Sequence, residues 1–369
     1  MDFDFSNEQK LIGEQARSFL QKECSNEVVR QVLDTDAPYA EDLWKKMAEL
    51  GWMGIAIPEE YGGTGLSYLE LAVIAEEIGR ALAPVPYSSS VYLATEALLL
   101  AGSPAQKDKW LPALAAGSAI GTVAQHAAQG GQQMASLPST AGDTAQGKVL
   151  AVPDAEVADF CVVLCREEAG SELSLVLVET AQPGVSVTPM EGIDRTRNVG
   201  DLNLDGATVE RLGEKGQGLE LLSRLFQRAA VLFAWEQLGG SDAALEQAKD
   251  YAMGRFAFGR PIASFQAIKH KLAHGAVKNM LARSNCYYGA WALNEDAPEL
   301  ELAAATARVS TTQAYYYCSK ENIQTHGGTG FTWEYDCHLH YRRAKYLSVV
   351  IGGEATWKKQ LASLLLPGS

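Results

Sequence analysis

Two stretches of the sequence carry side chains that could together bind a phosphate-bearing ligand. The first runs from Arg255 to Gln266, reads Arg-Phe-Ala-Phe-Gly-Arg-Pro-Ile-Ala-Ser-Phe-Gln, and contains Phe258. A guanidinium binds phosphate oxygens well because its N–H groups form a planar fork. Taken alone, an arginine beside aromatic residues is more typical of an ion pair at a surface or an interface.

The second stretch begins at Gln324 and reads Gln-Thr-His-Gly-Gly-Thr-Gly, which puts Gly327 and Gly328 side by side. Glycines let backbone N–H groups approach phosphate oxygens closely. A glycine run alone predicts only a turn that ends a helix. The two stretches in this order and spacing, each on helical sequence, are together specific for a ligand site.

The elements that must position these residues begin with helices over residues 1–120. Ser6 starts the pattern Ser-Asn-Glu-Gln, which is typical of a capping box at the start of a helix. Helical periodicity then recurs over 43–50, 68–83 and 92–101. Segments rich in Gly and Pro separate these helices, so we expect an N-terminal helical domain.

Residues 121–212 change to short β-branched runs separated by Gly, Pro and Asp, which predicts a small middle β domain. The stretch 127–143 is rich in Gln, Gly, Ser and Ala and predicts a loop or a weakly ordered strand. The predicted strands lie at 160–164, 173–178, 185–188 and 201–204.

Helical patterns return over residues 213–369 in four long runs, which predicts a C-terminal four-helix bundle. The fold class is therefore α+β, in the order helical domain, β domain, bundle. The four runs cover 219–253, 264–293, 299–325 and 338–366.

Charge and composition limit the partners of the chain. Its 31 Lys and Arg residues stand against 45 Asp and Glu, a net charge of −14, which argues against nucleic acid or an anionic membrane as partner. The start, Met-Asp-Phe-Asp-Phe-Ser, has no basic or apolar run, and no segment offers about 18 uninterrupted apolar residues. We expect a soluble, cytoplasmic protein.

No pattern in the sequence predicts a metal site. The six cysteines are scattered, and only Cys161 and Cys165 are close, at a spacing unlike metal-binding Cys-x-x-Cys. His338 and His340 stand two apart on a predicted helix and so point to different faces. We expect reduced, mostly buried thiols, and histidines that pack or line a ligand.

Two further stretches extend the pattern over nearly the whole chain. Residues 54–65 read Gly-Ile-Ala-Ile-Pro-Glu-Glu-Tyr-Gly-Gly-Thr-Gly, and residues 331–345 read Phe-Thr-Trp-Glu-Tyr-Asp-Cys-His-Leu-His-Tyr-Arg-Arg-Ala-Lys. With the first two stretches they make the chain resemble the acyl-CoA dehydrogenase family. The stretch 331–345 is similar to that of a branch of the family that acts on bulky acyl-CoAs such as steroid side chains, so the resemblance implies a large or ring-bearing acyl group.

The resemblance implies a cofactor, a reaction and partners. Members of the family use FAD to desaturate an acyl-CoA thioester, form dimers or dimers of dimers through the last bundle, and pass electrons to an electron-transfer flavoprotein. In such dimers one set of residues reaches the adenosine diphosphate part of the neighbour's FAD. The matching residues here are Arg255, Phe258, Gln266, Gln324, Gly327 and Gly328.

The chain departs from the family at the catalytic base, a carboxylate that removes the α-proton of the thioester. Members keep it in one of two places, which match Gly353 and Ala229 here, so neither position holds a carboxylate. Glu354 follows the first position directly, but the helix dipole favours it as an N-terminal carboxylate. Glu236 lies two turns beyond the second, about 10 Å along the helix.

The middle domain departs from the family as well. Members usually contact the flavin ring and the substrate through a Thr-Glu-Pro-x-x-Gly-Ser-Asp-like segment and a Trp-x-Thr segment. The matching regions here read Ala-Gln-His-Ala-Ala-Gln-Gly-Gly from Ala124 and Leu-Ala-Val-Pro-Asp from Leu150. Pro153 stands where the threonine would be and offers neither a hydroxyl nor an N–H. The sequence predicts a grip on the nucleotide end of FAD but not on its reactive end.

Three hypotheses account for this asymmetry. In the leading one, the chain is a subunit of a heterotetrameric acyl-CoA dehydrogenase and completes the FAD site of a related partner that carries the base. In the second, it is a self-sufficient homo-oligomer with Glu354 as base. In the third, it is a non-redox acyl-CoA-binding or assembly protein on the same fold, against which the retained Arg255, Phe258 and Gln324 argue.

Overall fold

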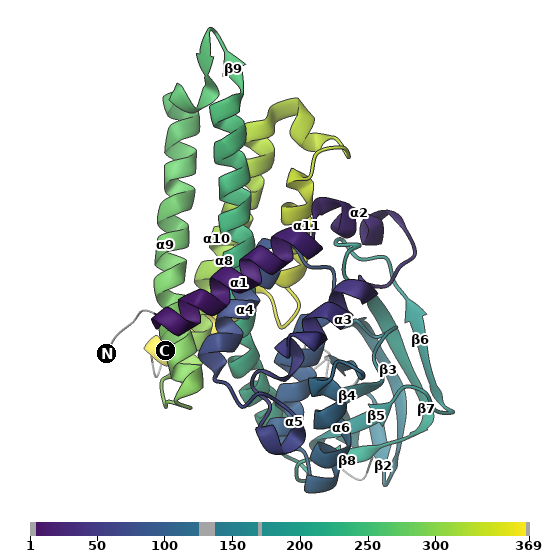
Figure 1. Cartoon of the computed structure of the whole chain (residues 1–369). Helices are drawn as coiled ribbons and strands as arrows, with labels where there is room; N and C mark the ends of the chain where they lie inside the picture. The colour runs from purple at the N-terminus through teal and green to yellow at the C-terminus, as the bar shows by residue number, and fades with distance from the viewer. Residues whose placement is uncertain (1–4, 125–136, 169–171, 367–369) are drawn as a thin grey trace. The chain divides into compact units, whose positions relative to one another are not determined.

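The computed structural model describes residues 5–124, 137–168 and 172–366 (Figure 1). The chain divides into two compact units, each assembled from separate segments. The helical unit comprises residues 1–29, 68–83 and 230–369. The sheet unit comprises residues 30–67 and 84–229.

Long helices make up most of the helical unit, and α1 begins as the sequence predicts. The hydroxyl of Ser6 accepts from the backbone N–H of Gln9, while the Gln9 side chain accepts from the Ser6 N–H, so the capping box is confirmed. Its helices are α1 (Asn7–Glu23), α4 (Tyr68–Arg80), most of α8 (Gly218–Gly254), α9 (Gln266–Asn294), α10 (Leu300–His326), α11 (Cys337–Leu347) and α12 (Glu354–Leu365).

Helices α4 and α8 cross at a pair of glycines that lets their backbones touch. A Cβ built on Gly79 would lie 1.8 Å from the carbonyl oxygen of Glu236, and one on Gly239 would lie 1.8 Å from that of Glu76. No larger residue fits at either position without moving a backbone. The two glycines therefore fix α4 against the bundle.

Eight strands form one sheet in the sheet unit, ordered β6-β7-β3-β2-β4-β5-β8, with β1 paired to β4. Pairings are antiparallel except those of β4 with β1 and β2. The strands are β1 (Gly121–Ala124), β2 (Ser139–Ala141), β3 (Thr144–Pro153), β4 (Phe160–Glu167), β5 (Leu173–Glu179), β6 (Val185–Pro189), β7 (Val199–Thr208) and β8 (Glu210–Leu212).

Short helices complete the sheet unit. They include α3 (Glu41–Glu49), the 3₁₀ turns η1 (Trp52–Gly54) and η2 (Glu59–Tyr61), the π-helix η3 (Ser88–Thr95), α5 (Glu96–Ala101) and α6 (Pro104–Ala115), while α2 (Asn26–Asp34) spans the boundary of the two units. Buried β-branched and small residues of β3, β4, β5 and β7 form a core around one face of the sheet.

The α+β fold with helices at both ends of the chain and a middle sheet is confirmed, with three local differences. The run predicted over 338–366 is broken into α11 and α12 by residues 348–353. Strands β1, β3 and β8 were not predicted. Of the loop or weakly ordered strand expected over 127–143, residues 127–136 lie outside the described residues, and the short strand β2 lies in the described remainder.

The three domain boundaries, 1–120, 121–212 and 213–369, remain a prediction, because the two compact units follow a different, discontinuous division. Among the described helices, none combines the length and the apolar character that crossing a membrane requires.

Candidate cofactor-binding site

A short hairpin joins α8 to α9 at one end of the helical unit (Figure 1). It consists of β9 (Phe256–Ala257), β10 (Arg260–Pro261) and the 3₁₀ turn η4 (Ile262–Ser264). Its two central residues, Phe258 and Gly259, have φ angles of 53° and 79°. Positive φ at both positions defines a type I′ turn, the tightest connection compatible with strand twist.

Phe258 occupies this turn at an unfavourable conformation. A bulky residue with positive φ is rare, because its Cβ crowds the backbone. The side chain is 95% exposed, and among the described residues its ring contacts that of Phe265, at a centroid distance of 6.2 Å. An aromatic ring that is exposed on a strained turn adds little to the stability of the chain itself, so we infer that it serves binding.

Arg255 precedes the hairpin and directs its side chain to solvent. Its backbone N–H donates to the carbonyl of Tyr251 at 2.8 Å, which continues the last turn of α8. Its guanidinium forms no hydrogen bond or ion pair with any residue that the structure describes. The exposed side-chain amides of Gln266 and Gln324 are likewise unused within the described chain. These polar groups remain available to a ligand or another chain.

The glycine-rich turn η5 (Gly327–Phe331) ends α10, and its glycines have different reasons to be glycine. Gly327 has φ 64° and ψ −135°, a conformation that other residues rarely adopt. A Cβ on Gly330 would lie 2.4 Å from the carbonyl oxygen of Ile323. Gly328 has neither constraint, since its φ is not positive and a Cβ there would meet nothing within 4 Å. The open space above Gly328 is where a ligand group could reach the backbone.

The structure brings the hairpin and the glycine turn to the same end of the helical unit. The rings of Tyr251 on α8 and His326 on α10 stack with centroids 4.0 Å apart. The ammonium of Lys271 on α9 pairs with Glu321 on α10 at 2.9 Å. Since Tyr251 lies just before the hairpin and His326 directly before the glycine turn, all six predicted cofactor residues gather there.

The chemistry of this end fits the diphosphate of a dinucleotide. Arg255 offers a forked cation that can donate two hydrogen bonds to a phosphate, and the turn at Gly328 offers unobstructed backbone. Phe258 adds a flat apolar surface against which a ring can stack. A cofactor with adenine and phosphate groups matches this donor set.

The structure provides no carboxylate at either of the two predicted base positions. Ala229 is fully buried in α8. Gly353 is the N-cap of α12 and provides no side chain to accept a proton. Proton abstraction from an acyl thioester therefore has no carboxylate at either position in this chain.

Glu354, the first residue of α12, is held by two neighbours. Lys358 pairs with its Oε1 at 2.6 Å, and the Gln313 amide donates to the same oxygen at 2.8 Å. These contacts, the one with Lys358 first, lower the pKa of Glu354 below its usual value. A carboxylate with a lowered pKa at a helix N-terminus is a poor proton acceptor.

Glu236 is fully buried in α8 and faces Arg343, whose guanidinium lies 3.8 Å away. Arg308 is buried as well and donates to Gln237 and to the carbonyl of Leu347. Burial lowers the pKa of Arg308 to about 9, while the charge of Glu236 acts to raise it. Glu236 therefore balances buried guanidinium charge in the core of the helical unit.

The end of β3 in the sheet unit is closed by a buried ion pair. Asp154 follows Pro153, and the guanidinium of Arg197 donates to its Oδ2 at 2.7 Å, with both side chains almost inaccessible to solvent. Arg197 also donates to the hydroxyl of Ser88 at 2.8 Å, and Ser89 donates to Asp154. Where the family resemblance implies a threonine for the flavin ring, this chain has a proline beside a buried ion pair.

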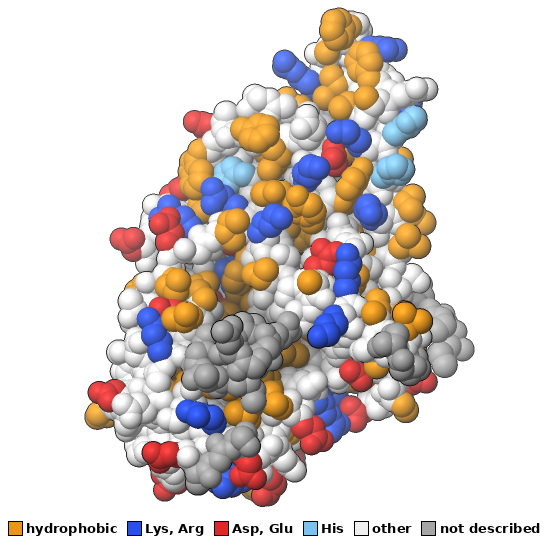
Figure 2. Space-filling view, turned by 180° about the vertical axis from the view of Figure 1, so that it is seen from behind, with side chains coloured by type: hydrophobic (Ala, Val, Ile, Leu, Met, Phe, Trp, Pro, Cys, Tyr) orange, Lys and Arg blue, Asp and Glu red, His pale blue; other side chains and the backbone are white. Residues whose placement is uncertain are grey.

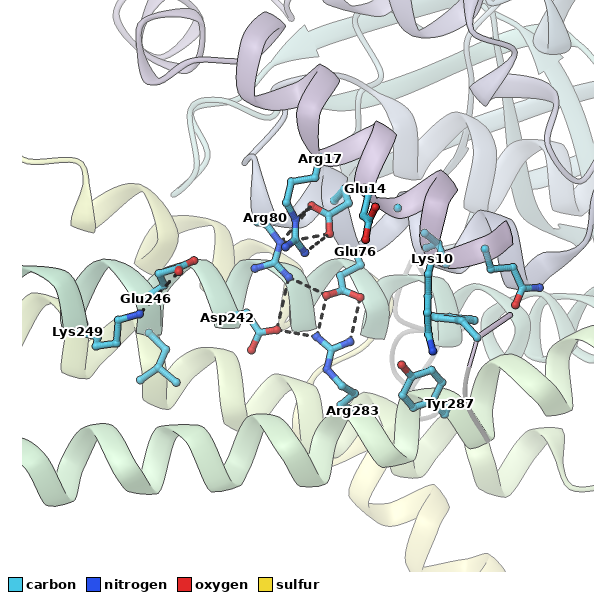
Figure 3. Close-up of a pocket in the computed structure, with 16 residues that line it drawn as sticks. Lys10, Glu14, Arg17, Glu76, Arg80, Asp242, Glu246, Lys249, Arg283 and Tyr287 are labelled. Atoms are coloured by element: carbon cyan, nitrogen blue, oxygen red, sulfur yellow. Dashed lines mark hydrogen bonds and ion pairs between the residues drawn. The ribbon is translucent and has the colours of Figure 1, made fainter. Parts of the chain in front are cut away.

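A separate cavity of about 620 Å³ lies among α1, α4, α8 and α9 (Figure 3). Arg283 forms two hydrogen bonds to Glu76, at 2.8 and 3.1 Å, and one to Asp242 at 2.6 Å. Arg80 joins the same network, bonding Glu76 at 2.7 Å, and Arg17 pairs with Glu77 on the other side. These charges neutralise one another, so the network holds α1 and α4 to the bundle.

The sequence reasoning missed two groups of polar residues. Asp154 and Arg197 are distant in the sequence, and no sequence motif predicts that they form an ion pair. The same holds for Arg308 and its partner Gln237. The absence of Asp and Glu from residues 251–294, by contrast, can be read directly from the sequence.

Comparisons with known proteins cover almost the whole chain. Residues 6–118 match the model of the acyl-CoA dehydrogenase N-terminal domain, and residues 216–365 match that of the C-terminal domain. The acyl-CoA dehydrogenase IpdE2 of Mycolicibacterium smegmatis is 31% identical over 348 residues, which are 94% of this chain and 95% of the relative.

Two solved structures of this kind have closely similar folds. A chain of the ChsE4-ChsE5 complex from Mycobacterium tuberculosis is 27% identical, covers 100% of both chains and has a TM-score of 0.90. A chain of the Tcur3481-Tcur3483 steroid ACAD is 28% identical, covers 98% of both chains and has a TM-score of 0.88.

Proposed function

Because this chain belongs to the acyl-CoA dehydrogenase family, whose members are FAD-dependent oxidoreductases that act on acyl-CoA thioesters, we propose that it is the subunit that completes the FAD site of a related, base-bearing partner. The two chains together then form a hetero-oligomeric enzyme. The relatives support this arrangement, since ChsE4-ChsE5 and Tcur3481-Tcur3483 are both named as pairs of chains.

One observation carries the proposal: the residues that match the family's cofactor contacts lie together at one end of the helical unit, while neither position that matches its base holds a carboxylate. Arg255, Gln266 and Gln324 are unused by the described chain, and Phe258 is exposed on a strained turn. The base positions hold Ala229 and Gly353. A chain that functioned alone would need both halves of the site.

The bound FAD would supply the hydride acceptor for the hydrogen that leaves the β-carbon. This chain's part is to bind and orient the nucleotide end of that FAD. Arg255 would neutralise the diphosphate, and the open backbone at Gly327 and Gly328 would provide N–H groups to it. Phe258 and the two glutamines, Gln266 and Gln324, would hold the remainder of the adenosine diphosphate.

A bulky, ring-bearing acyl-CoA is the substrate class that the relatives favour. One of the similar structures is named a steroid ACAD. The stretch 331–345 of this chain resembles the same branch of the family. An electron-transfer flavoprotein is the proposed electron acceptor, in keeping with a similar structure whose name concerns such a flavoprotein of Acidaminococcus fermentans, 26% identical with a TM-score of 0.90.

The proposal is tested by removing the Arg255 guanidinium from the assembled protein. The tagged chain is purified from its own organism, so that its partner accompanies it, and FAD per chain is measured by absorbance after denaturation. Arg255→Ala should lose most of the FAD while the complex stays assembled. The matched control is Arg166→Ala, which removes another exposed arginine, on strand β4. Unchanged FAD content in Arg255→Ala would overturn the proposal.

A further inference from the structure

Helix α9 presents an exposed apolar stripe to solvent. Val277, Met280 and Leu281 are 53%, 72% and 63% exposed. Their spacing of three and four residues puts them on one face of the helix. His274 and His270 are exposed one and two turns earlier on that face, respectively. A stripe of large apolar residues at this spacing is the usual sign of a helix that packs against another chain.

The charged residues of the segment that carries the stripe are all basic. Residues 251–294 contain no Asp or Glu, although the whole chain has a net charge of −14. The inward-facing Lys271 and Arg283 pair with carboxylates of other helices. The remaining cations of the segment are Arg255, Arg260, Lys269 and Lys278. Figure 2 shows Lys, Arg and His side chains interspersed with hydrophobic ones toward the hairpin end of the helical unit.

We propose that this surface binds a related chain whose complementary face is acidic, and that it disfavours a second copy of this chain. The surface is called the α9 face and consists of His270, His274, Val277, Met280 and Leu281 with the flanking Lys269 and Lys278. This proposal rests on the proposed function and adds that the partner's contacting face is acidic. An apolar centre with a charged rim is the anatomy of a specific protein interface.

Two-fold symmetry disfavours self-association through the α9 face. In a two-fold dimer the same patch meets itself, so α9 would lie against a second α9. Every charged side chain on one α9 face would then find only positive charges opposite, because neither α9 contributes a carboxylate. Like charges brought together in this way select against the wrong partner. The basic rim thus favours a hetero-oligomer over a homo-oligomer.

The test uses an altered copy of the chain as an acidic partner of known identity. Lys269→Glu, His270→Glu and Lys278→Glu are combined in one variant, which reverses the rim and leaves the apolar stripe intact. Wild type and variant are studied singly and as a mixture by analytical ultracentrifugation at about 50 and about 500 mM salt, where screening lengths differ severalfold. Circular dichroism verifies that the variant is folded.

We expect the mixture to form a mixed dimer at low salt, with a dissociation constant that rises at least about tenfold at high salt, while neither protein dimerises alone. Adding Met280→Asp to both chains should abolish the mixed dimer, because it interrupts the stripe. A wild-type homodimer that is stable at low salt and is weakened by the reversed charges would overturn the inference. A mixture in which both proteins stay monomeric would overturn it as well.

This test can fail independently of the test of the proposed function. The ultracentrifugation experiment measures the mass of the assembly, whereas the Arg255→Ala experiment measures FAD content. Mixed dimers together with unchanged FAD in Arg255→Ala would refute only the shared FAD site. Wild-type self-pairing through α9 together with loss of FAD in Arg255→Ala would refute only the selection by charge.

Discussion

In the turn after α10, one glycine is required by packing and another is not. Gly330 is required by packing, because a Cβ there would lie 2.4 Å from the backbone oxygen of Ile323. Gly328 is required by nothing in the described chain, since a Cβ there meets no atom within 4 Å. A residue that the fold does not need as glycine is the better candidate for a contact with a ligand.

Gly328→Ala should therefore leave stability within about 0.5 kcal/mol of wild type and lower FAD affinity of the assembled complex at least about tenfold. Gly330→Ala is the matched control and should lower stability by about 2 kcal/mol, because backbone must move to admit the methyl group. Urea unfolding and fluorescence titration with FAD measure the two effects. Normal FAD affinity in Gly328→Ala would argue against the turn as a phosphate contact.

Glu354 provides the direct test of the self-sufficient alternative. Glu354→Gln keeps the acceptor for Gln313 and loses the exposed pair with Lys358, which contributes less than about 1 kcal/mol. We expect kcat of the native complex to stay within about twofold of wild type, because the proposed function assigns the base to the partner. Loss of a general base instead lowers kcat by about 10²- to 10⁴-fold, and such a loss would restore Glu354 as the base.

At the scale of elements, the crossing of α4 and α8 depends on glycine. Gly79→Ala should destabilise the protein by about 2 kcal/mol or more, because the new Cβ would lie 1.8 Å from the carbonyl oxygen of Glu236. The control is Gly254→Ala at the end of α8, where a Cβ meets nothing and helix propensity gains less than about 1 kcal/mol. Thermal unfolding compares the two, and equal stabilities would contradict the close packing.

The ion-pair network among α1, α4, α8 and α9 predicts a dependence of stability on pH. Burial acts to raise the pKa of Glu76, but Arg283, with Arg80 and Arg17, lowers it below its usual value overall. A carboxylate with a lowered pKa in the folded state stabilises the protein above its usual pKa, and this contribution is lost as the pH falls through the folded-state pKa.

Arg283→Met removes the main partner of Glu76 and should lower the free energy of unfolding at pH 7 by about 3 kcal/mol. The difference from wild type should shrink as the pH falls toward 3, because protonated Glu76 no longer needs the partner. Urea unfolding at several pH values measures this. A difference that is constant across pH would mean that Arg283 acts by packing alone.

Local rules predicted much of this fold, and long-range contacts account for what they missed. The capping box at Ser6 and the long periodic helices α8, α9 and α10 are visible in the sequence, because the relevant residues are neighbours along the chain. Strand β3 was missed because its burial alternates irregularly around register shifts in its pairing with β7.

The candidate site divides in the same way. Motifs predicted Arg255 and the glycine turn, but only the structure brings their two helix ends together through the stacked rings of Tyr251 and His326. The strained turn at Phe258 was not predictable, because residue type alone argues against positive φ there. The buried pair of Asp154 and Arg197 depends on segments that fold together from separate parts of the chain.

At the scale of the whole molecule, the chain has a fold that matches complete acyl-CoA dehydrogenases end to end and yet lacks the usual catalytic carboxylate. The proposals assign both the basic α9 face and Arg255, which has no side-chain partner among the described residues, to contacts with another chain. The proposed division of labour between two related chains would explain why the fold is kept although neither position that matches the family's base holds a carboxylate.

The most direct test of this account is the ratio of FAD to protein chains, measured with the mass of the assembly, for the protein purified alone and for the complex purified from its own organism. The account predicts a colourless protein alone and a yellow, active hetero-oligomer with one FAD for every two chains. A yellow homo-oligomer that oxidises an acyl-CoA by itself would contradict it.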